Sequence, residues 1–355
     1  MSPVAPTPAT LVADEFLSYL QIRRGMSVPG YLRAPVEVPD GWETYTYYLQ
    51  LHGRNRLPPE FRQPLTLRVL AGPEGLPRLR REWRVQNWLA QQGYPVARPL
   101  LREEDAGFLG GPFMLMQWVD GTRLLERILR DYFALLWAPA RMAEVHAQLH
   151  ALPVQDLPQP RRSFLDRQLE TFQAVVDECG VHGLAPGVDW LRAHRPAEIE
   201  APCLLHLDFH AKNILTHGAR IAAVLDWSEA QSGDRHADVA MALLMIDVAP
   251  VQDASRLDRL MLPIGRFLTH HLYLNAYRSN LPLDRRRLRY YQAWAAMWRL
   301  SYFGRWLTDG PHVTGYKPTA VRHVRKMLVS RLERYFQRFS GTAIRLGLPV
   351  APGEE

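Results

Sequence analysis

The chain carries the sequence His206-Leu207-Asp208-Phe209-His210-Ala211-Lys212-Asn213, and thirteen residues after Asn213 comes the aspartate of Val224-Leu225-Asp226-Trp227. Short apolar runs separate the two polar groups, and they flank a turn at His217-Gly218. This pattern predicts a β-hairpin. Because a hairpin brings the start of its first strand beside the end of its second, we expect Asn213 and Asp226 to lie close together.

The side chains of this stretch suit phosphoryl transfer, which needs a positioned nucleophile and cations that neutralise the transferring group. Mg²⁺ takes oxygen ligands, and the amide oxygen of Asn213 and the carboxylate of Asp226 meet that demand. The Asp208 carboxylate can accept a hydrogen bond from an incoming hydroxyl and orient it. We expect His206 to hold the loop by hydrogen bonds. The pattern His-x-Asp-x-x-x-x-Asn alone arises by chance in roughly a few per cent of such chains, but the following strand and Asp226 make chance a poor explanation.

This stretch resembles the catalytic loop and metal-binding aspartate of the aminoglycoside phosphotransferase/choline kinase family, whose members are small-molecule relatives of protein kinases. In that family a tryptophan commonly follows the metal-binding aspartate and a second aspartate comes about a dozen residues later, as in Asp226-Trp227 and Asp238-Val239-Ala240. The resemblance covers roughly residues 35–300 and is strongest over 203–242. It implies an α+β, bilobal, protein-kinase-like fold with a small β-rich N-lobe and a larger, mainly helical C-lobe.

The resemblance also implies roles for single residues. Asp208 corresponds to the catalytic aspartate, Asn213 and Asp226 to the Mg²⁺ ligands, and Asp238 to a residue that braces the catalytic loop. The family most often has glycine before the catalytic aspartate, whereas this chain has Leu207, and a leucine predicts ordinary backbone angles there.

The nucleotide-binding half is expected to precede residue 120. Lysine occurs first at Lys212, so a cation needed earlier must be arginine or histidine. Arg68 occupies the position of the family's third-strand cation, and Glu82 is its expected ion-pair partner. Without the family, the same two residues would be an ordinary surface arginine and a solvated glutamate. The other expected contacts to ATP or GTP are Gly41 and Thr44 around the phosphate-covering turn, and Met116, Gln117 and Trp118 at a hinge that also suits a plain buried strand.

The spacing of apolar residues and the positions of glycine and proline predict strands over 44–51, 65–70 and 113–119. They predict helices over 11–24, 79–91 and 142–152. We divide the chain into four parts: an N-terminal extension with a short helix (1–30), a nucleotide-binding N-lobe (31–119), a helical C-lobe with the catalytic loop and the metal-binding hairpin at 203–227 (120–345), and a tail (346–355).

Composition excludes several classes of protein. The 355 residues are 47% hydrophobic and 22% charged, with two cysteines, so neither a disulfide framework nor a cysteine metal site is expected. No uncharged apolar run of eighteen residues predicts a membrane span, and the first residues do not form a secretory signal. These absences predict a cytoplasmic protein with no membrane role. The resemblance to the phosphotransferase family implies that its partner is a small hydroxyl compound.

The acceptor is predicted from charge. Residues 251–350 contain eighteen Lys and Arg against five Asp and Glu, so a neutral or anionic hydroxyl compound ranks above a polycationic aminoglycoside. The alternative explanation for this excess of basic residues is a solvated surface that binds no ligand. Glu229, Asp234 and Trp298 are the expected substrate contacts, with Asp247 a further acid, although aromatic stripes such as the one containing Trp298 usually form core.

Three other functions rank below a kinase for small molecules. A pseudokinase that binds nucleotide as a regulatory module is the alternative, because the phosphate-covering turn has one glycine and arginine replaces lysine. Protein phosphorylation ranks lower, since no Ala-Pro-Glu-like activation segment follows Asp226. Nucleic-acid binding ranks last, because no zinc-finger, RNP or basic-zipper pattern accompanies the charge.

Overall fold

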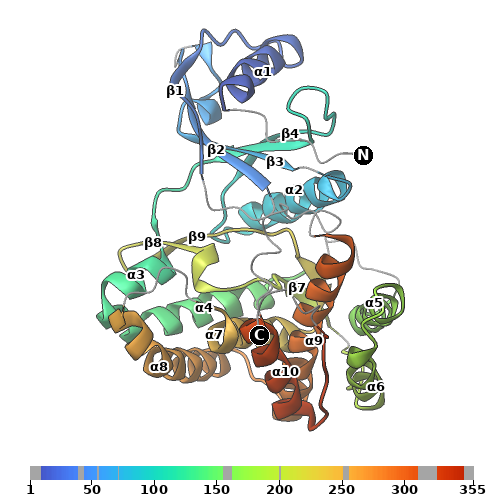
Figure 1. Cartoon of the computed structure of the whole chain (residues 1–355). Helices are drawn as coiled ribbons and strands as arrows, with labels where there is room; N and C mark the ends of the chain where they lie inside the picture. The colour runs from blue at the N-terminus through green and yellow to red at the C-terminus, as the bar shows by residue number, and fades with distance from the viewer. Residues whose placement is uncertain are drawn as a thin grey trace. The chain divides into compact units, whose positions relative to one another are not determined.

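A computed structural model describes residues 9–38, 44–53, 56–70, 72–154, 162–199, 201–250, 256–310 and 326–347. The chain forms two compact units (Figure 1). The first holds the described residues up to Gly121 together with the segment Ala222–Ser228, and the second holds most of the rest. The segment Ala222–Ser228 therefore belongs with the N-terminal half, although it lies far along the chain.

The first unit is built on an antiparallel sheet of five strands in the order β1-β2-β3-β5-β4. The strands are β1 (Tyr31–Glu37), β2 (Thr44–Leu51), β3 (Leu65–Leu70), β4 (Pro99–Glu103) and β5 (Phe113–Gln117). β3 is central and buried along its whole length, so its two polar residues, Thr66 and Arg68, are buried together with its apolar ones. Since Arg68 lies on β3, the sheet places this residue in the interior of the unit.

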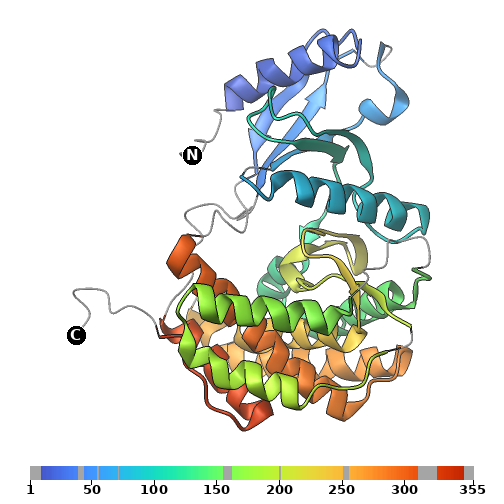
Figure 2. The ribbon, with the colours of Figure 1, turned by 90° about the vertical axis from the view of Figure 1, so that its right-hand side faces the viewer.

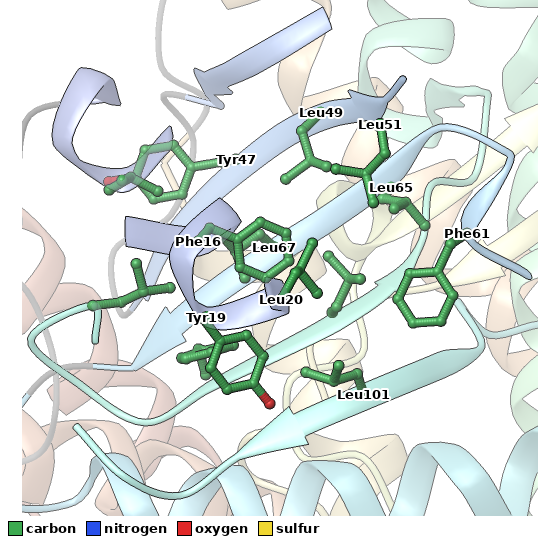
Figure 3. Packing of buried hydrophobic residues seen from close by; sticks show 14 of the residues in the cluster. Phe16, Tyr19, Leu20, Tyr47, Leu49, Leu51, Phe61, Leu65, Leu67 and Leu101 are labelled. Carbon is green, nitrogen blue, oxygen red and sulfur yellow. The ribbon is translucent and has the colours of Figure 1, made fainter. Parts of the chain in front are cut away.

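Helix α1 (Ala9–Ile22) packs on this sheet and completes its core. Phe16, Tyr19 and Leu20 are fully buried in one cluster with strand residues such as Leu65 and Leu67 (Figure 3). Full burial of an apolar side chain of this size stabilises the fold by about 2 kcal/mol. The short helix predicted for the N-terminal extension therefore contributes to the core of the first unit.

Helix α2 (Gly75–Gln91) begins four residues earlier than the predicted helix over 79–91. Pro77 lies in its first turn, where the missing backbone N–H is not needed. The predicted strand over 113–119 ends at Gln117, and Trp118 Nε1 donates to Asp120 Oδ1 at 2.7 Å in the turn that follows. Strands β2 and β3 have the predicted bounds.

The second unit is mainly helical (Figure 2). Its helices are α3 (Leu124–Arg130), α4 (Ala138–Ala151), α5 (Phe164–Glu178), α6 (Ala185–Ala193), α7 (Arg235–Val248), α8 (Arg256–Asn280), α9 (Arg285–Asp309) and α10 (Lys326–Ser340). α4 packs along α8, and α5 packs beside α6, the two green helices of Figure 2. α9 is buried over most of its length, including Tyr291 and Trp294, so the aromatic stripe there is largely core.

Short strands lie on either side of the loop formed by residues 206–213. β7 (Cys203–Leu205) pairs antiparallel with β10 (Gln231–Gly233). β6 (Thr122–Arg123), β8 (Ile214–His217) and β9 (Arg220–Val224) form a three-stranded sheet in the order β6-β8-β9. Gly218 has φ +62° in the turn between β8 and β9, a conformation that favours glycine. The predicted hairpin is therefore present, and residues 206–213 form the loop that leads into it.

Candidate active site

Asp208 lies at the centre of a hydrogen-bond network in the second unit. The Asn213 side-chain amide donates to Asp208 Oδ2 and to its backbone carbonyl, both at 3.0 Å. His210 Nε2 lies 3.2 Å from Oδ2, and Arg299 from α9 donates to Oδ1. Because the amide nitrogen of Asn213 is used for these bonds, its amide oxygen is the atom that a cation could use.

The pKa of Asp208 reflects these contacts. Burial favours the protonated acid, but the neighbouring His210 imidazole and the Arg299 guanidinium outweigh burial and hold the pKa of this carboxyl well below its usual range. Asp208 is therefore an anion at neutral pH, which can accept a hydrogen bond from a hydroxyl.

Leu207 adopts a backbone conformation that its sequence does not predict. Its φ is +63°, in the left-handed region that glycine favours, and this overturns the expectation of ordinary angles. Such a conformation costs a non-glycine residue about 1–2 kcal/mol. The Leu207 N–H donates to Asp238 Oδ1 at 2.7 Å, and the leucine side chain is fully buried. Asp238 and side-chain packing therefore stabilise the strained turn.

Asp238, on α7, holds the loop through both of its carboxylate oxygens. Oδ1 accepts from the Leu207 N–H, and Oδ2 accepts from the His206 N–H at 2.5 Å. Oδ2 also lies 3.0 Å from His146 Nε2 and 3.1 Å from His150 Nε2, both on α4. Asp238 thus connects two helices to the backbone of residues 206 and 207, the arrangement that a bracing residue needs.

The two histidines are oriented from their other side by tyrosines of α8. His146 Nδ1 lies 2.7 Å from Tyr273 Oη, and His150 Nδ1 lies 2.5 Å from Tyr277 Oη. The two histidines are four residues apart on α4, and the two tyrosines are four residues apart on α8. Side chains at i and i+4 share one face of a helix, so the same contact occurs twice. If each tyrosine donates to Nδ1, each Nε2 carries the proton that Asp238 accepts, so neutral histidines satisfy the whole network.

The stability of the protein should depend on pH through His146. Burial lowers the pKa of this residue from the usual 6.5 to about 4, although Asp238 opposes the shift. The unfolded chain therefore takes up a proton first as the pH falls, and the free energy of unfolding should decrease by about 3 kcal/mol between pH 6.5 and pH 4 from this group alone. Urea unfolding at a series of pH values measures how the free energy of unfolding changes with pH.

Substitutions identify the titrating group. His146→Gln should flatten the curve between pH 6.5 and pH 4, whereas His217→Gln, at an exposed position, should leave it unchanged. A curve for His146→Gln that is as steep as the parent's would assign the dependence to other groups.

The first unit holds the second group of predicted residues. Arg68 Nη1 lies 2.9 Å from Glu82 Oε2, so the expected ion pair is present, and Arg68 also donates to Thr44 Oγ1 at 3.2 and 3.3 Å. Glu82 is fully buried, and burial raises the pKa of its carboxyl while the Arg68 charge lowers it. Arg68 Nη2 lies 3.6 Å from Asp226 Oδ1, so one guanidinium joins three of the predicted residues.

Asp226 fits a cation. It follows β9 with φ +65°, and Trp227 beside it is buried, donating from Nε1 to the Val224 carbonyl at 3.1 Å. Among the described residues, nothing donates a hydrogen bond to Asp226 Oδ1, although this oxygen is shielded from solvent. A shielded carboxylate oxygen is unfavourable unless positive charge compensates it. The Arg68 guanidinium at 3.6 Å supplies such charge, and a hard metal ion with oxygen ligands could bind the same carboxylate.

Removal of the Arg68 charge should destabilise the first unit. Arg68→Met leaves the buried Glu82 without the cation that pairs with it, and we expect a loss of about 3 kcal/mol in the free energy of unfolding. Arg80→Met is the matched control, because the Arg80–Glu104 pair is exposed and such pairs contribute about 0–1 kcal/mol. Urea unfolding compares the two variants, and equal losses would contradict a special role for the buried pair.

The remaining predicted residues are placed as follows. Gly41 lies outside the described residues. Met116 and Gln117 are on β5, and the backbone N–H groups of Gln117 and Trp118 donate to the carbonyls of Arg98 (2.9 Å) and Pro64 (3.1 Å). The role of this segment toward adenine stays a prediction.

The predicted substrate residues are buried and already engaged. Glu229 accepts from Tyr302 Oη at 3.0 Å, and Trp298 is 3% exposed and lies against the ring of Tyr302. Asp234 is the N-cap of α7 and lies 2.7 Å from Arg287 Nε. Their roles toward a substrate stay predictions.

Arg299 was not predicted. It lies 91 positions from Asp208 in the sequence, so no local motif links the two. The signal that could have found it is an arginine inside the otherwise apolar run Ala293–Leu300 of a buried helix.

Comparison with known proteins decides the family. The sequence model of the phosphotransferase enzyme family matches residues 36–265. The chain belongs to this phosphotransferase family. Such enzymes are kinases that transfer phosphate to a hydroxyl group, as the aminoglycoside kinases among its relatives indicate.

Two curated relatives illustrate the range of the match to this phosphotransferase. Acyl-CoA dehydrogenase family member 11 of Gallus gallus is 30% identical over 240 residues, 61% of this chain and 29% of that protein. Hygromycin-B 4-O-kinase of Escherichia coli is 37% identical over 75 residues, 21% of this chain and 22% of the kinase. The phosphotransferase thus spans less than a third of the length of these relatives.

The fold of the phosphotransferase is that of solved aminoglycoside phosphotransferases. A thermostable mutant of one of them, crystallised with AMP-PNP and hygromycin B, covers 93% of this chain and 100% of its own with a TM-score of 0.63 at 18% identity. This confirms the predicted α+β, protein-kinase-like fold. Among the described residues, no helix is long and apolar enough to cross a membrane.

Proposed function

We propose that the phosphotransferase moves the γ-phosphate of ATP or GTP to a hydroxyl of a neutral or anionic small molecule, with Mg²⁺ as cofactor. The observation that carries this proposal is the position of the Asp208 carboxylate, whose oxygens lie against Asn213, His210 and Arg299. Asn213 orients this carboxylate, and Asp238 holds the backbone just before it. These residues have the character that orientation of an alcohol nucleophile requires.

The proposed reaction is a direct transfer. The acceptor hydroxyl donates a hydrogen bond to Asp208, its oxygen forms a bond to the γ-phosphorus, and the bond between that phosphorus and the β–γ bridging oxygen breaks. The hydroxyl proton passes to Asp208, and the nucleoside diphosphate leaves. A bound Mg²⁺ would neutralise charge on the phosphates, and Asn213 and Asp226 would hold it.

Nucleotide binding is proposed for the first unit. Arg68 is the cation for the phosphates, since it is held in place by Glu82 and Thr44. An arginine stays charged and can contact two phosphate oxygens at once, although its planar group does not reproduce the geometry of a lysine. The ternary complex of the solved relative with AMP-PNP supports a nucleotide site on this fold.

The acyl-CoA dehydrogenase family relatives suggest one acceptor class. Their names indicate acyl thioesters of coenzyme A, which carry several phosphate charges, and the basic character of residues 251–350 favours an anionic acceptor. Hydroxyacyl-CoA compounds therefore belong in an acceptor screen beside hydroxy acids, sugars and aminoglycosides.

The test is nucleotide turnover. The purified chain is incubated with ATP or GTP across this set of acceptors, with and without Mg²⁺, while diphosphate release and the mass of the product are followed. Mg²⁺-dependent formation of a phosphate monoester is expected. Nucleotide binding without any phosphorylated product would favour the alternative, a pseudokinase that acts as a regulatory module.

A further inference from the structure

Arg299 is fixed beside the oxygen of Asp208 that would meet the acceptor. It extends from α9, donates to Asp208 Oδ1, and lies 3.6 Å from Met245 Sδ. Its guanidinium carbon is 5.0 Å from the centre of the Trp298 ring, a cation–π arrangement. Contacts on several sides hold the charge in one place, which is a requirement for selective binding.

The contacts of Asp208 indicate which oxygen receives the hydroxyl. Oδ2 already faces Asn213 Nδ2 at 3.0 Å and His210 Nε2 at 3.2 Å. A carboxylate oxygen has about two acceptor positions, so the incoming hydroxyl is directed to Oδ1, which it shares with Arg299. Two donors on one oxygen lie within about 5 Å of each other. The guanidinium is therefore close to whatever group the acceptor carries next to its hydroxyl.

Three acids of the second unit that could have bound an ammonium group have other partners among the described residues. Glu229 accepts from Tyr302, Asp234 pairs with Arg287, and Asp247 lies 2.9 Å from His270 Nδ1. A cationic acceptor would thus place its charge against Arg299, and like charges at this separation repel.

We propose that Arg299 determines acceptor specificity by binding an oxyanion, a carboxylate or a phosphate, that the acceptor carries a few bonds from the reacting hydroxyl. A guanidinium presents five N–H donors, so it can serve Asp208 and a second oxyanion together. An ammonium at the same place on the acceptor is excluded. This inference rests on the proposed function and narrows its substrate class from neutral or anionic compounds to anionic ones.

The test uses sets of acceptors that share a hydroxylated three- or four-carbon chain and differ in one terminal group and its charge. Glycerate and glycerol 3-phosphate are the anions, glyceramide is the neutral member and 3-amino-1,2-propanediol is the cation, with 3-hydroxybutyrate and its amide as a second pair. The measured quantity is the ratio of kcat/KM for an anion to that for its neutral counterpart. An effect of the substitution on Asp208 itself applies to both acceptors and cancels in this ratio. Glycerate and glycerol 3-phosphate distinguish a carboxylate from a phosphate.

In the parent, the anion should be preferred by about 30-fold, the effect expected of a charged hydrogen bond. Arg299→Gln should reduce the preference to about onefold, mainly through the KM of the anion. Arg299→Lys should restore part of it, because the charge returns without the planar group. Arg289→Gln is the control, an exposed arginine on the same helix that donates to the Phe339 carbonyl, and should keep the parent ratio.

Three results would overturn the inference. Turnover that is equal for anionic, neutral and cationic acceptors would refute it and leave the proposed function standing. An anion preference that survives in Arg299→Gln would assign the specificity to another group. Absence of a phosphorylated product with every acceptor, charged or not, would refute the proposed function and with it this inference.

Discussion

Asp208→Asn should reduce phosphoryl transfer by about 10³-fold, within the range that removal of a positioned acid–base group produces. An amide cannot take up the hydroxyl proton, and its NH₂ group faces either Arg299 or the donors Asn213 and His210, so it also disturbs the orientation of the side chain. The measurement is diphosphate release with the best acceptor of the screen, at saturating nucleotide and Mg²⁺.

Two controls separate catalysis from folding. The residues proposed for nucleotide binding include Arg68 and Thr44 of the first unit, so Asp208→Asn should bind Mg²⁺–nucleotide within about threefold of the parent, because its substitution is in the second unit. Asp189→Asn, at an exposed site on α6, should turn over like the parent. If Asp208→Asn kept parental turnover, the assignment of the catalytic carboxylate would be wrong.

The sequence predicted best the strands, the hairpin and the loop motif, which depend mainly on residues that are neighbours in the chain. Strands β2 and β3 have the bounds that their β-branched and aromatic residues indicated, because each is a continuous run between clear turn signals. The hairpin of β8 and β9 was equally clear, since a glycine turn separates two short apolar runs. The catalytic-loop motif was recognisable because all of its polar residues lie within eight positions.

The sequence did not predict what depends on tertiary contacts. Arg299 reaches Asp208 from 91 positions away, and Tyr273 meets His146 across 127 positions. Tyr273 taken alone looks like an ordinary helix residue, and Arg299 is conspicuous only as a charge within an apolar run, which does not name its partner. A spacing rule finds such pairs only when both helices are already known to face each other.

Leu207 shows how tertiary structure overrides local preference. Leucine disfavours the left-handed conformation, so the sequence argued for ordinary angles. The structure places it at φ +63° because Asp238 bonds the adjacent N–H groups and the side chain fills a buried site. A local penalty of about 1–2 kcal/mol is outweighed by these contacts, which are invisible from the neighbouring sequence.

The second large effect is expected at Asp238, and it concerns stability. Asp238→Asn should reduce the free energy of unfolding by about 4 kcal/mol, the usual result of removing one partner from a buried charged network. The carboxylate accepts from two backbone N–H groups and faces two histidine Nε2 atoms. The amide NH₂ would point at donors in either orientation, so at least one buried donor loses its acceptor. Urea unfolding at pH 7.5 gives the value.

The pH dependence of this difference tests its cause. Burial would raise the pKa of Asp238, but His146 and His150 lower it well below the usual value. A carboxylate with a depressed pKa stabilises the folded state above its unfolded pKa of about 4, and this contribution is lost as the pH falls toward the folded pKa. The difference in the free energy of unfolding between the parent and Asp238→Asn should therefore be constant above pH 5 and decrease below pH 4.

Asp247→Asn is the matched control for Asp238. Asp247 lies on the same helix and pairs with a histidine, His270, but its side chain is 21% exposed, so the loss should stay below about 1 kcal/mol. Turnover adds a second readout, because Asp238 bonds the residues just before Asp208. Asp238→Asn should turn over more slowly than the parent even without urea, when the variant is fully folded. Parental stability together with parental turnover in Asp238→Asn would show that residues 206–208 hold their conformation without this carboxylate.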